Sequence, residues 1–319
     1  MSGDVIVVGG GVSGLATAVV LAERGLRVRV WTREEVDRTT SSVAGGLWWP
    51  YRIEPKERVA AWAVETLRVY EEFARQPEET GVRLVPGVAA DERPEALGAW
   101  ASEVGGLRAA RADELPPGHT EGVRARLPLI DMPAHLGWLR RRLEAAGGTV
   151  EPRTVRSLAE PAGAARTVVN CTGLDARTLV PDPGVRPVRG QLVLVENPGI
   201  DEWFAVEDET ATRTTYFMPQ PGRLILGGTA EDGDWRGEPD PATAREIVAG
   251  CALIRPEIAG ARILGHRVGL RPSRPAGVRI ESERRPDGGL LVHNYGHGGA
   301  GVTVAWGCAR AAAALVTEG

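Results

Sequence analysis

Hydrophobic residues at the start of the chain follow the order strand, glycine-rich turn, helix, strand. Asp4 to Val8 is a short apolar run typical of a buried parallel strand. Apolar residues then recur at helical spacing over 13–24 and stop at Gly25. From Leu26 to Trp31 they alternate with arginines, which predicts a second strand. The first segment of the chain is therefore expected to form one βαβ unit.

The remaining pattern changes type in the middle of the chain. Helices are predicted over 56–75, from Asp131 to a stop at Gly147, over 241–254 and over 302–316. Short strands are predicted at 168–170, 191–195, 214–218, 224–226 and 290–293. Residues 81–130, rich in proline, glycine and polar breaks, resist assignment. Strand–helix alternation at both ends, with antiparallel-looking strands between them, predicts an α/β fold with a discontinuous domain arrangement.

Composition and charge limit the expected partners. The net charge is -4, which gives no basic field for a nucleic acid. No apolar stretch of about 18 residues and no N-terminal targeting pattern appear, so we expect a cytoplasmic protein without membrane contact. The three cysteines, Cys171, Cys251 and Cys308, are too few and too widely spaced for a disulfide framework or a zinc site. No metal is expected.

The turn after the first strand, Gly9-Gly10-Gly11-Val12-Ser13-Gly14, fits G-x-G-x-x-G. Gly9 permits the tight turn, Gly11 lets a pyrophosphate approach the backbone, and Gly14 lets the helix pack closely on the strand. The helix start offers amide groups and a positive dipole end to the phosphates. The alternative is a merely tight turn. The position of the motif between a strand and a helix favours a dinucleotide site.

The second strand lacks the usual ribose-binding acid at its end. The segment reads Trp31-Thr32-Arg33-Glu34, so the acid comes about one residue late. Two interpretations stay open: Arg33 could lie over the adenosine, and Glu34 could be a surface charge. The residue that contacts the ribose is therefore undecided.

Four further segments resemble the D-amino-acid oxidase family. They are TTSSVAGGLW at 39–48, VNCTG at 169–173, VGLRPSRP at 268–275 and HNYGHGGAGVT at 293–303, which leads to WGCA at 306–309. Together with the N-terminal turn they span nearly the whole chain in the family's order. The composition, dominated by alanine, arginine and glycine, is typical of a bacterial member from a GC-rich genome.

The resemblance implies non-covalently bound FAD. A related branch links flavin to a cysteine, which makes Cys308 a candidate, but its place in an apolar helix favours a buried structural thiol. The implied FAD-binding residues are Gly9, Gly11, Val12, Ser13, Gly14, Arg33, Glu34, Thr39, Thr40, Ser41, Gly45, Gly46, Leu47, Val155, Thr172, Arg274, Gly298, Gly299, Ala300, Gly301, Val302 and Thr303. We expect a Rossmann-type FAD-binding domain over 1–50, 131–187 and 263–319, and a substrate-binding domain on a mixed β-sheet over 51–130 and 188–262.

The resemblance also implies the catalytic residues. Arg274 is expected to bind the substrate carboxylate through two hydrogen bonds, with Arg271 as a structural ion-pair partner. The Tyr216 hydroxyl is expected to meet the same carboxylate, against the alternative of a core strand tyrosine. The Gly299 carbonyl is expected to accept a hydrogen bond from the substrate amine.

Two aromatic residues follow the flavin-binding loop. Trp49 and Tyr51 are expected in the substrate pocket, with at least one of Trp48 and Trp49 as a wall and core packing as the alternative. His297 is interpreted as a scaffold residue. Asp234 and Trp235 resemble the family and are interpreted as structural.

The implied reaction is oxidative deamination of neutral D-amino acids by hydride transfer from Cα–H to flavin N5. The products are 2-oxo acids, ammonia and hydrogen peroxide, and the partners are a D-amino acid and oxygen, with a homodimer left open. Alternatives are an FAD-dependent dehydrogenase with another acceptor, a D-aspartate or glycine/sarcosine oxidase, and a non-catalytic flavin-binding scaffold. The C-terminal glycine cluster disfavours an NAD-linked dehydrogenase.

An acidic substrate is disfavoured by the segment after the Gly-Gly-Thr turn. It reads Ala230-Glu231-Asp232, where the acidic-substrate branch carries an arginine. Arg213 is the residue that could supply the missing cation.

Overall fold

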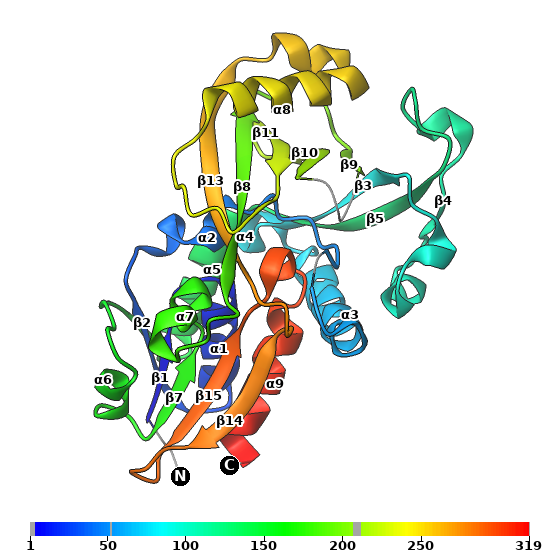
Figure 1. Ribbon diagram of the computed structural model, residues 1–319. Helices are drawn as coiled ribbons and strands as arrows, with labels where there is room; N and C mark the ends of the chain where they lie inside the picture. Colours follow the sequence, from blue (N-terminus) through cyan, green and yellow to red (C-terminus); the bar gives the residue numbers. More distant parts are fainter. Residues whose placement is uncertain (1–3, 52, 207–211, 319) are drawn as a thin grey trace.

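The computed structural model describes residues 4–51, 53–206 and 212–318. Their helices and strands form two regions, each built on one β-sheet (Figure 1). Residues 1–3, 52, 207–211 and 319 of the expected domain ranges lie outside the described part of the chain.

The first region is built on a six-stranded sheet with the order β14-β15-β7-β1-β2-β6. Its strands are β1 (Asp4–Val8), β2 (Arg27–Thr32), β6 (Thr149–Pro152), β7 (Thr167–Asn170), β14 (Arg279–Arg284) and β15 (Leu290–Tyr295). The pairs run parallel, except that β14 is antiparallel to β15. This matches the Rossmann-type arrangement expected from the two ends of the chain.

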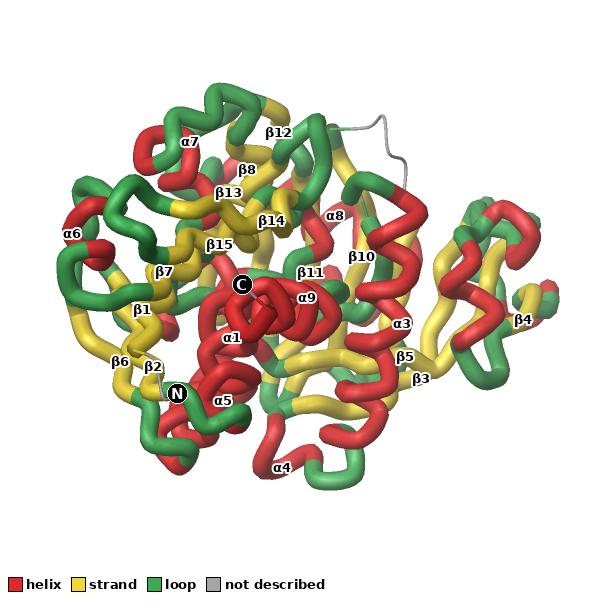
Figure 2. The backbone as a smooth tube through the Cα atoms, turned by 90° about the horizontal axis from the view of Figure 1, so that it is seen from below, coloured by secondary structure: helices red, strands yellow, loops and turns green. Residues whose placement is uncertain are grey.

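Three helices cover one face of this sheet, as the view from below shows (Figure 2). They are α1 (Val12–Glu23), α5 (Met132–Ala145) and α9 (Ala305–Glu318). Alternate strand residues such as Val5, Val7 and Val30 join their core, whereas Ile6 and Val8 pack in a smaller cluster on the opposite face. Burial on both faces explains the continuous apolar run at 5–8.

The second region is built on a nine-stranded mixed sheet with the order β12-β8-β11-β10-β9-β3-β5-β4, in which β13 also pairs with β8. The strands are β3 (Val82–Ala90), β4 (Arg108–Ala109), β5 (Gly122–Ile130), β8 (Arg186–Val195), β9 (Trp203–Val206), β10 (Arg213–Gln220), β11 (Arg223–Thr229), β12 (Glu231–Asp232) and β13 (Ile263–Ser273). Helix α8 (Pro241–Ile254) covers the outer face, where Val193, Phe217 and Ile247 pack together. The alternate residues Leu192, Tyr216 and Met218 face a cavity instead.

The remaining elements are short apart from α3 (Lys56–Phe73), which packs against α9. The other helices are α2 (Thr40–Val43), α4 (Pro77–Thr80), α6 (Ala159–Ala162) and α7 (Ala176–Leu179). Single 3-10 turns lie at Val36–Arg38, Pro94–Ala96, Ala99–Glu103, Ala112–Glu114, Gly173–Asp175, Pro256–Gly260 and Gly298–Ala300. Among the described residues, no helix combines the length and apolar character needed to cross a bilayer.

Two expectations about the sheets need correction. The segment 263–273, expected in the FAD-binding domain, pairs along its length with β8 and so belongs to the second sheet. Residues 81–130, left unassigned, contain the long antiparallel pair β3 and β5. Proline and glycine at 86 and 87 are rare inside strands and make this pair difficult to predict from the sequence. Glycine is required at 87 because a Cβ there would lie 2.2 Å from the Trp203 ring.

The helix after residue 131 forms where expected, but its cap differs. Asp131 is the N-cap residue of α5, yet its side chain makes no capping hydrogen bond. Asp131 Oδ1 instead accepts a hydrogen bond from Arg223 Nη2 at 2.7 Å. This carboxylate therefore ties the helix start to the second sheet.

Candidate active site

A cavity of about 640 Å³ lies between the two regions and is lined from both sheets. One end is formed by the glycine-rich turn after β1, the other by β10, β11 and β13. All the residues expected to bind FAD line this cavity except Arg274 and Ala300, and Tyr216, Trp49 and Tyr51 line it as well. Ala300 is buried, with 1% of its surface exposed.

The glycine-rich turn forms a cradle that side chains would fill. Gly9 has φ +116°, and a Cβ there would lie 2.3 Å from the Cys171 carbonyl oxygen. A Cβ on Gly14 would lie 1.9 Å from the Gly9 carbonyl oxygen, so only glycine lets α1 begin this close to β1. Ser41 Oγ accepts a hydrogen bond from Val12 N at 3.0 Å and so fixes the 39–41 loop beside the helix start. This geometry fits a pyrophosphate at the helix N-terminus.

Charged side chains surround the end of the cavity near β2. Arg33 Nη1 lies 2.9 Å from Asp175 Oδ2 and Arg33 also pairs with Glu34. Thr32 Oγ1 donates to the Glu34 carbonyl oxygen at 2.8 Å, which turns the chain at the place of the usual acid. Arg153 lies over the Trp31 ring, 3.8 Å from its centroid, and was missed because no motif marks it. These residues are placed to enclose the adenosine half of a dinucleotide.

The glycine cluster between β15 and α9 lies against the segment 49–51. A Cβ on Gly299 would lie 2.9 Å from Tyr51 Cδ1. Thr303 Oγ1 donates to the Trp49 carbonyl oxygen at 2.8 Å and accepts from Trp49 N at 3.2 Å. Trp49 therefore forms part of the wall, whereas Trp48 is fully buried and donates to the Ala63 carbonyl oxygen.

His297 lines the cavity but is held as a scaffold residue. Its Nε2 lies 3.0 Å from Asn294 Oδ1, and the residue is almost wholly buried. Burial lowers the pKa of His297 to about 4, so the ring is neutral near pH 7. Cys308 is fully buried in α9, and burial raises its pKa, which agrees with a structural thiol.

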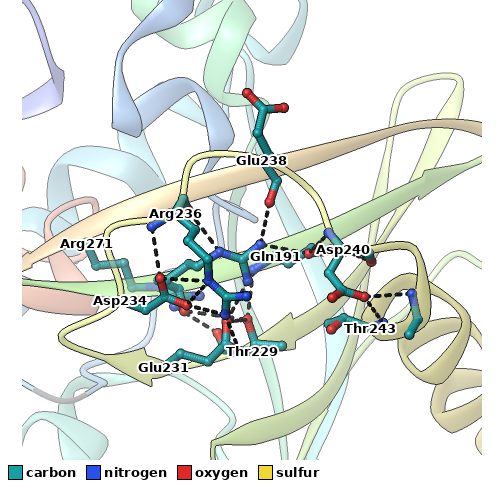
Figure 3. A network of polar contacts seen from close by, with 11 residues as sticks. Gln191, Thr229, Glu231, Asp234, Arg236, Glu238, Asp240, Thr243 and Arg271 are labelled. Carbon is teal, nitrogen blue, oxygen red and sulfur yellow. Dashed lines mark hydrogen bonds and ion pairs between the residues drawn. The ribbon is translucent and has the colours of Figure 1, made fainter.

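Two polar side chains reach the other end of the cavity across glycines. The ring of Tyr216 on β10 lies over Gly227 on β11, where a Cβ would be 1.9 Å from Tyr216 Cζ. The guanidinium of Arg271 on β13 lies over Gly190 on β8, where a Cβ would be 2.4 Å from Nη1. Arg271 Nη1 donates to the Thr229 carbonyl oxygen at 2.9 Å (Figure 3).

Arg274, expected to bind both the substrate carboxylate and the cofactor, does not line this cavity. Its Nε donates to Asp182 Oδ2 at 2.8 Å and its Nη1 to the Gly277 carbonyl oxygen at 3.0 Å. Burial raises the pKa of Asp182, but hydrogen bonds from Arg274 and Tyr295 outweigh it and hold the pKa below its usual value. Arg274 follows the end of β13, whereas Arg271 lies within the strand on the face of Gly269. The arginine at the cavity is therefore Arg271.

Charged residues considered for an acidic substrate are paired outside the cavity. Arg213 pairs with Glu246, Asp232 with Arg186, and Glu231 with Arg189. Among the described residues, no cluster of three potential metal ligands was found. Trp235, interpreted as structural, lines the cavity with 53% of its surface exposed.

Fold and site together define a dinucleotide-binding protein whose cofactor cradle faces a mixed sheet with an arginine and a tyrosine. The chain matches the family described as FAD dependent oxidoreductase over residues 4–315. It is 63% identical over 316 residues to a D-amino-acid oxidase of Streptomyces coelicolor, covering 99% of this chain and 97% of the relative. It is 35% identical to a D-aspartate oxidase of Homo sapiens, covering 98% and 94%.

Solved structures show the same fold at low identity. A glycine oxidase from Bacillus cereus superimposes with a TM-score of 0.79 at 19% identity, covering 99% of this chain and 95% of the other. The chain therefore belongs to the family of FAD-dependent oxidoreductases that includes the D-amino-acid oxidases, and FAD is its cofactor.

Proposed function

We propose that this protein oxidises neutral D-amino acids to 2-oxo acids, with release of ammonia and formation of hydrogen peroxide from oxygen. The observation that carries this proposal is that Arg271 and Tyr216, each lying over a glycine of a neighbouring strand, line the same cavity as the glycine-rich turn. It is supported by the D-amino-acid oxidases of Streptomyces coelicolor and Rubrobacter xylanophilus, which are 63% and 50% identical to this chain.

Arg271 is the proposed anchor for the substrate carboxylate. A guanidinium presents two parallel N–H groups to a carboxylate and so fixes its plane as well as its position. Its bond to the Thr229 carbonyl and its position over Gly190 hold the guanidinium in one orientation. The Tyr216 hydroxyl supplies a further hydrogen bond to the same carboxylate.

Gly299 is proposed to receive the substrate amine through its carbonyl oxygen. The glycine lies beside Tyr51, so the amine site would lie at the same end of the cavity as the wall formed by Trp49. Bound FAD supplies the acceptor for the hydride that leaves the substrate Cα. The contribution of the chain is to orient the Cα–H bond and exclude water, and no acid–base side chain is required.

The proposed preference for substrates with uncharged side chains follows from the charges near Arg271 and Tyr216. Among the lining residues that the structure describes, Arg271 is the arginine on the sheet that carries Tyr216, whereas Arg33 and Arg38 follow β2 and Arg153 follows β6 of the first sheet. A second substrate carboxylate would lack a partner, and an unpaired buried charge is costly. We therefore expect D-methionine to be a better substrate than D-aspartate.

Steady-state assays under air test the proposal. The FAD-loaded protein should form hydrogen peroxide and a 2-oxo acid in equal amounts from D-methionine. Turnover with an artificial dye but not with oxygen would favour the dehydrogenase alternative, and higher efficiency with glycine or D-aspartate would favour those oxidases. The cytoplasmic location and a homodimer stay predictions.

A further inference from the structure

A series of hydrogen bonds leads from the surface of the first sheet to Thr172 at the cavity. Strand β15 lies between β14 and β7, so Glu283, His293 and Asn170 come from three neighbouring strands (Figure 1). His293 and Asn170 are partners in the strand register, and both are fully buried. Thr172 follows Asn170 and lines the cavity beside the glycine-rich turn, where a Cβ on Gly9 would lie 3.5 Å from Thr172 N.

The side-chain amide of Asn170 can have only one orientation. Thr172 N lies 3.2 Å from Asn170 Oδ1 and, as a backbone N–H group, can only donate. The amide oxygen therefore faces Thr172, and the amide nitrogen Nδ2 faces His293. An inverted amide would set two N–H groups against each other, and a buried donor without an acceptor is costly.

This orientation also decides which nitrogen of His293 carries the proton. Asn170 Nδ2 donates to His293 Nδ1 at 3.2 Å, so Nδ1 must present its lone pair. The proton is then on Nε2, which donates to Glu283 Oε1 at 3.0 Å. Burial lowers the pKa of His293, although the Glu283 carboxylate acts in the opposite direction. The ring is therefore neutral near pH 7 and keeps the lone pair that Asn170 requires.

The Thr172 hydroxyl is left with its oxygen as the group that can bind a ligand. Thr172 Oγ1 lies 2.7 Å from Asn170 Oδ1, and the hydroxyl donates because an amide oxygen carries no proton. A hydroxyl has one hydrogen to donate and two lone pairs that accept. With its hydrogen directed at Asn170, Thr172 can only accept a hydrogen bond from a molecule in the cavity.

We propose that Asn170 and His293 are positioning residues that fix the Thr172 hydroxyl as a hydrogen-bond acceptor for FAD. The adenosine half of FAD carries donors of the matching kind, namely the ribose hydroxyls and the adenine amino group. Thr172 is well placed for them, because the nearby Asp175 pairs with Arg33 at the adenosine end of the cavity. The inference concerns cofactor binding and is independent of the substrate that the protein oxidises.

Two matched pairs of variants test this role. Thr172→Val removes the hydroxyl, whereas Thr172→Ser keeps it. His293→Asn places an amide oxygen near the position of Nδ1, where it can still accept from Asn170. His293→Gln places its amide near the position of Nε2 instead, so it keeps a partner for Glu283 but offers Asn170 no acceptor. The Kd for FAD is measured by reconstitution of apoprotein, and urea unfolding reports the stability of each apoprotein.

Thr172→Val should raise the Kd for FAD about fivefold and Thr172→Ser less than about twofold, since one neutral hydrogen bond changes a binding constant by a few-fold to about tenfold. His293→Gln should raise the Kd about threefold and His293→Asn less than about twofold, because only the first leaves the Asn170 amide without its acceptor. In the Thr172→Val background, His293→Gln should change the Kd no further, since the hydroxyl that it orients is absent.

The double variant separates positioning from a general loss of structure in β15. If His293→Gln multiplies the Kd by the same factor with and without the Thr172 hydroxyl, or if His293→Gln and His293→Asn act alike, the inference is overturned. An unchanged Kd in Thr172→Val overturns it as well, and this comparison remains decisive even if a His293 variant folds poorly. None of these outcomes bears on which amino acids are oxidised.

Discussion

The guanidinium of Arg271 lies directly over the backbone of Gly190, where a Cβ would come within 2.4 Å of Nη1. The two residues belong to the paired strands β13 and β8. The missing side chain at 190 makes room for the arginine to turn into the cavity and reach the Thr229 carbonyl. Gly190 is therefore part of the proposed carboxylate site although it offers no functional group.

Gly190→Ala should displace the guanidinium without disturbing the cofactor cradle. Because the arginine side chain is flexible, the protein should fold and retain FAD, but the two hydrogen bonds to the substrate carboxylate should lose their alignment. We expect catalytic efficiency on D-methionine to fall about tenfold or more, since each charge-assisted hydrogen bond contributes about 1.5–3 kcal/mol. Unchanged efficiency with normal FAD content would show that the guanidinium position over Gly190 is unimportant.

Substitution of Arg271 should lower catalytic efficiency, whereas substitution of Arg274 should lower stability. Arg271→Ala should keep FAD and stability but lower catalytic efficiency by at least about 100-fold, because two charge-assisted hydrogen bonds are lost. Arg274→Ala should leave the partly buried Asp182 without its ion-pair partner and lower the free energy of unfolding by about 3 kcal/mol. Its efficiency per FAD-loaded molecule should stay near the wild-type value. The reverse outcome would return the anchor role to Arg274.

Ser41→Ala should weaken FAD binding selectively. Ser41 Oγ accepts the Val12 N–H at the start of α1, beside the expected pyrophosphate position. Loss of this bond removes about 1 kcal/mol of capping and loosens the 39–41 loop. The Kd for FAD, measured by reconstitution of apoprotein, should rise a few-fold to about tenfold. Ser42→Ala is the matched control, because Ser42 Oγ only donates to the Thr39 carbonyl.

Two buried histidines should make stability depend on pH. Burial lowers the pKa of both His135 and His297 to about 4, below the usual value of 6.5. The unfolded chain then binds more protons than the folded chain between these values. Stability from the neutral histidines is complete above about pH 6.5 and is lost as the pH falls toward 4. Urea unfolding should therefore show a lower free energy at pH 5 than at pH 7.

His135→Gln tests the contribution of one histidine to this dependence. His135 packs against Trp138 and its Nδ1 contacts the Thr80 carbonyl, which an amide N–H can also reach. The variant should be less stable at pH 7 but lose less stability between pH 7 and 5. An unchanged loss would show that His135 does not contribute to acid destabilisation.

The cofactor half of the site was predictable because its chemistry depends on local sequence. Gly9, Gly11 and Gly14 follow a strand and start a helix, and each position is set by backbone approach that only glycine permits. The same holds for the glycine cluster at 298–301, which lines the cavity as expected. The local sequence pattern was therefore sufficient to predict cofactor-binding residues that lie within a single turn.

The substrate half was harder to predict because it depends on strand register. The pairing of β13 with β8 decides which arginine of the segment 271–274 faces the cavity, whereas the local pattern predicts this segment in the other domain. The positions of Gly190 and Gly227 beneath the two polar side chains come from partner strands distant in sequence. The place of the segment that carries Trp235 likewise depends on a partner strand, because Arg189 of β8 binds its backbone.

A D-amino acid held by Arg271 should deliver its Cα hydride to the bound FAD. This transfer can be followed by anaerobic titration of the FAD-loaded protein with D-methionine and L-methionine, with the visible flavin absorbance as the readout. The D-isomer should bleach the flavin completely and the L-isomer not at all, and bleaching should be strongly slowed in Arg271→Ala. Bleaching by the L-isomer alone, or by neither isomer, would show that the protein does not oxidise D-amino acids in this way.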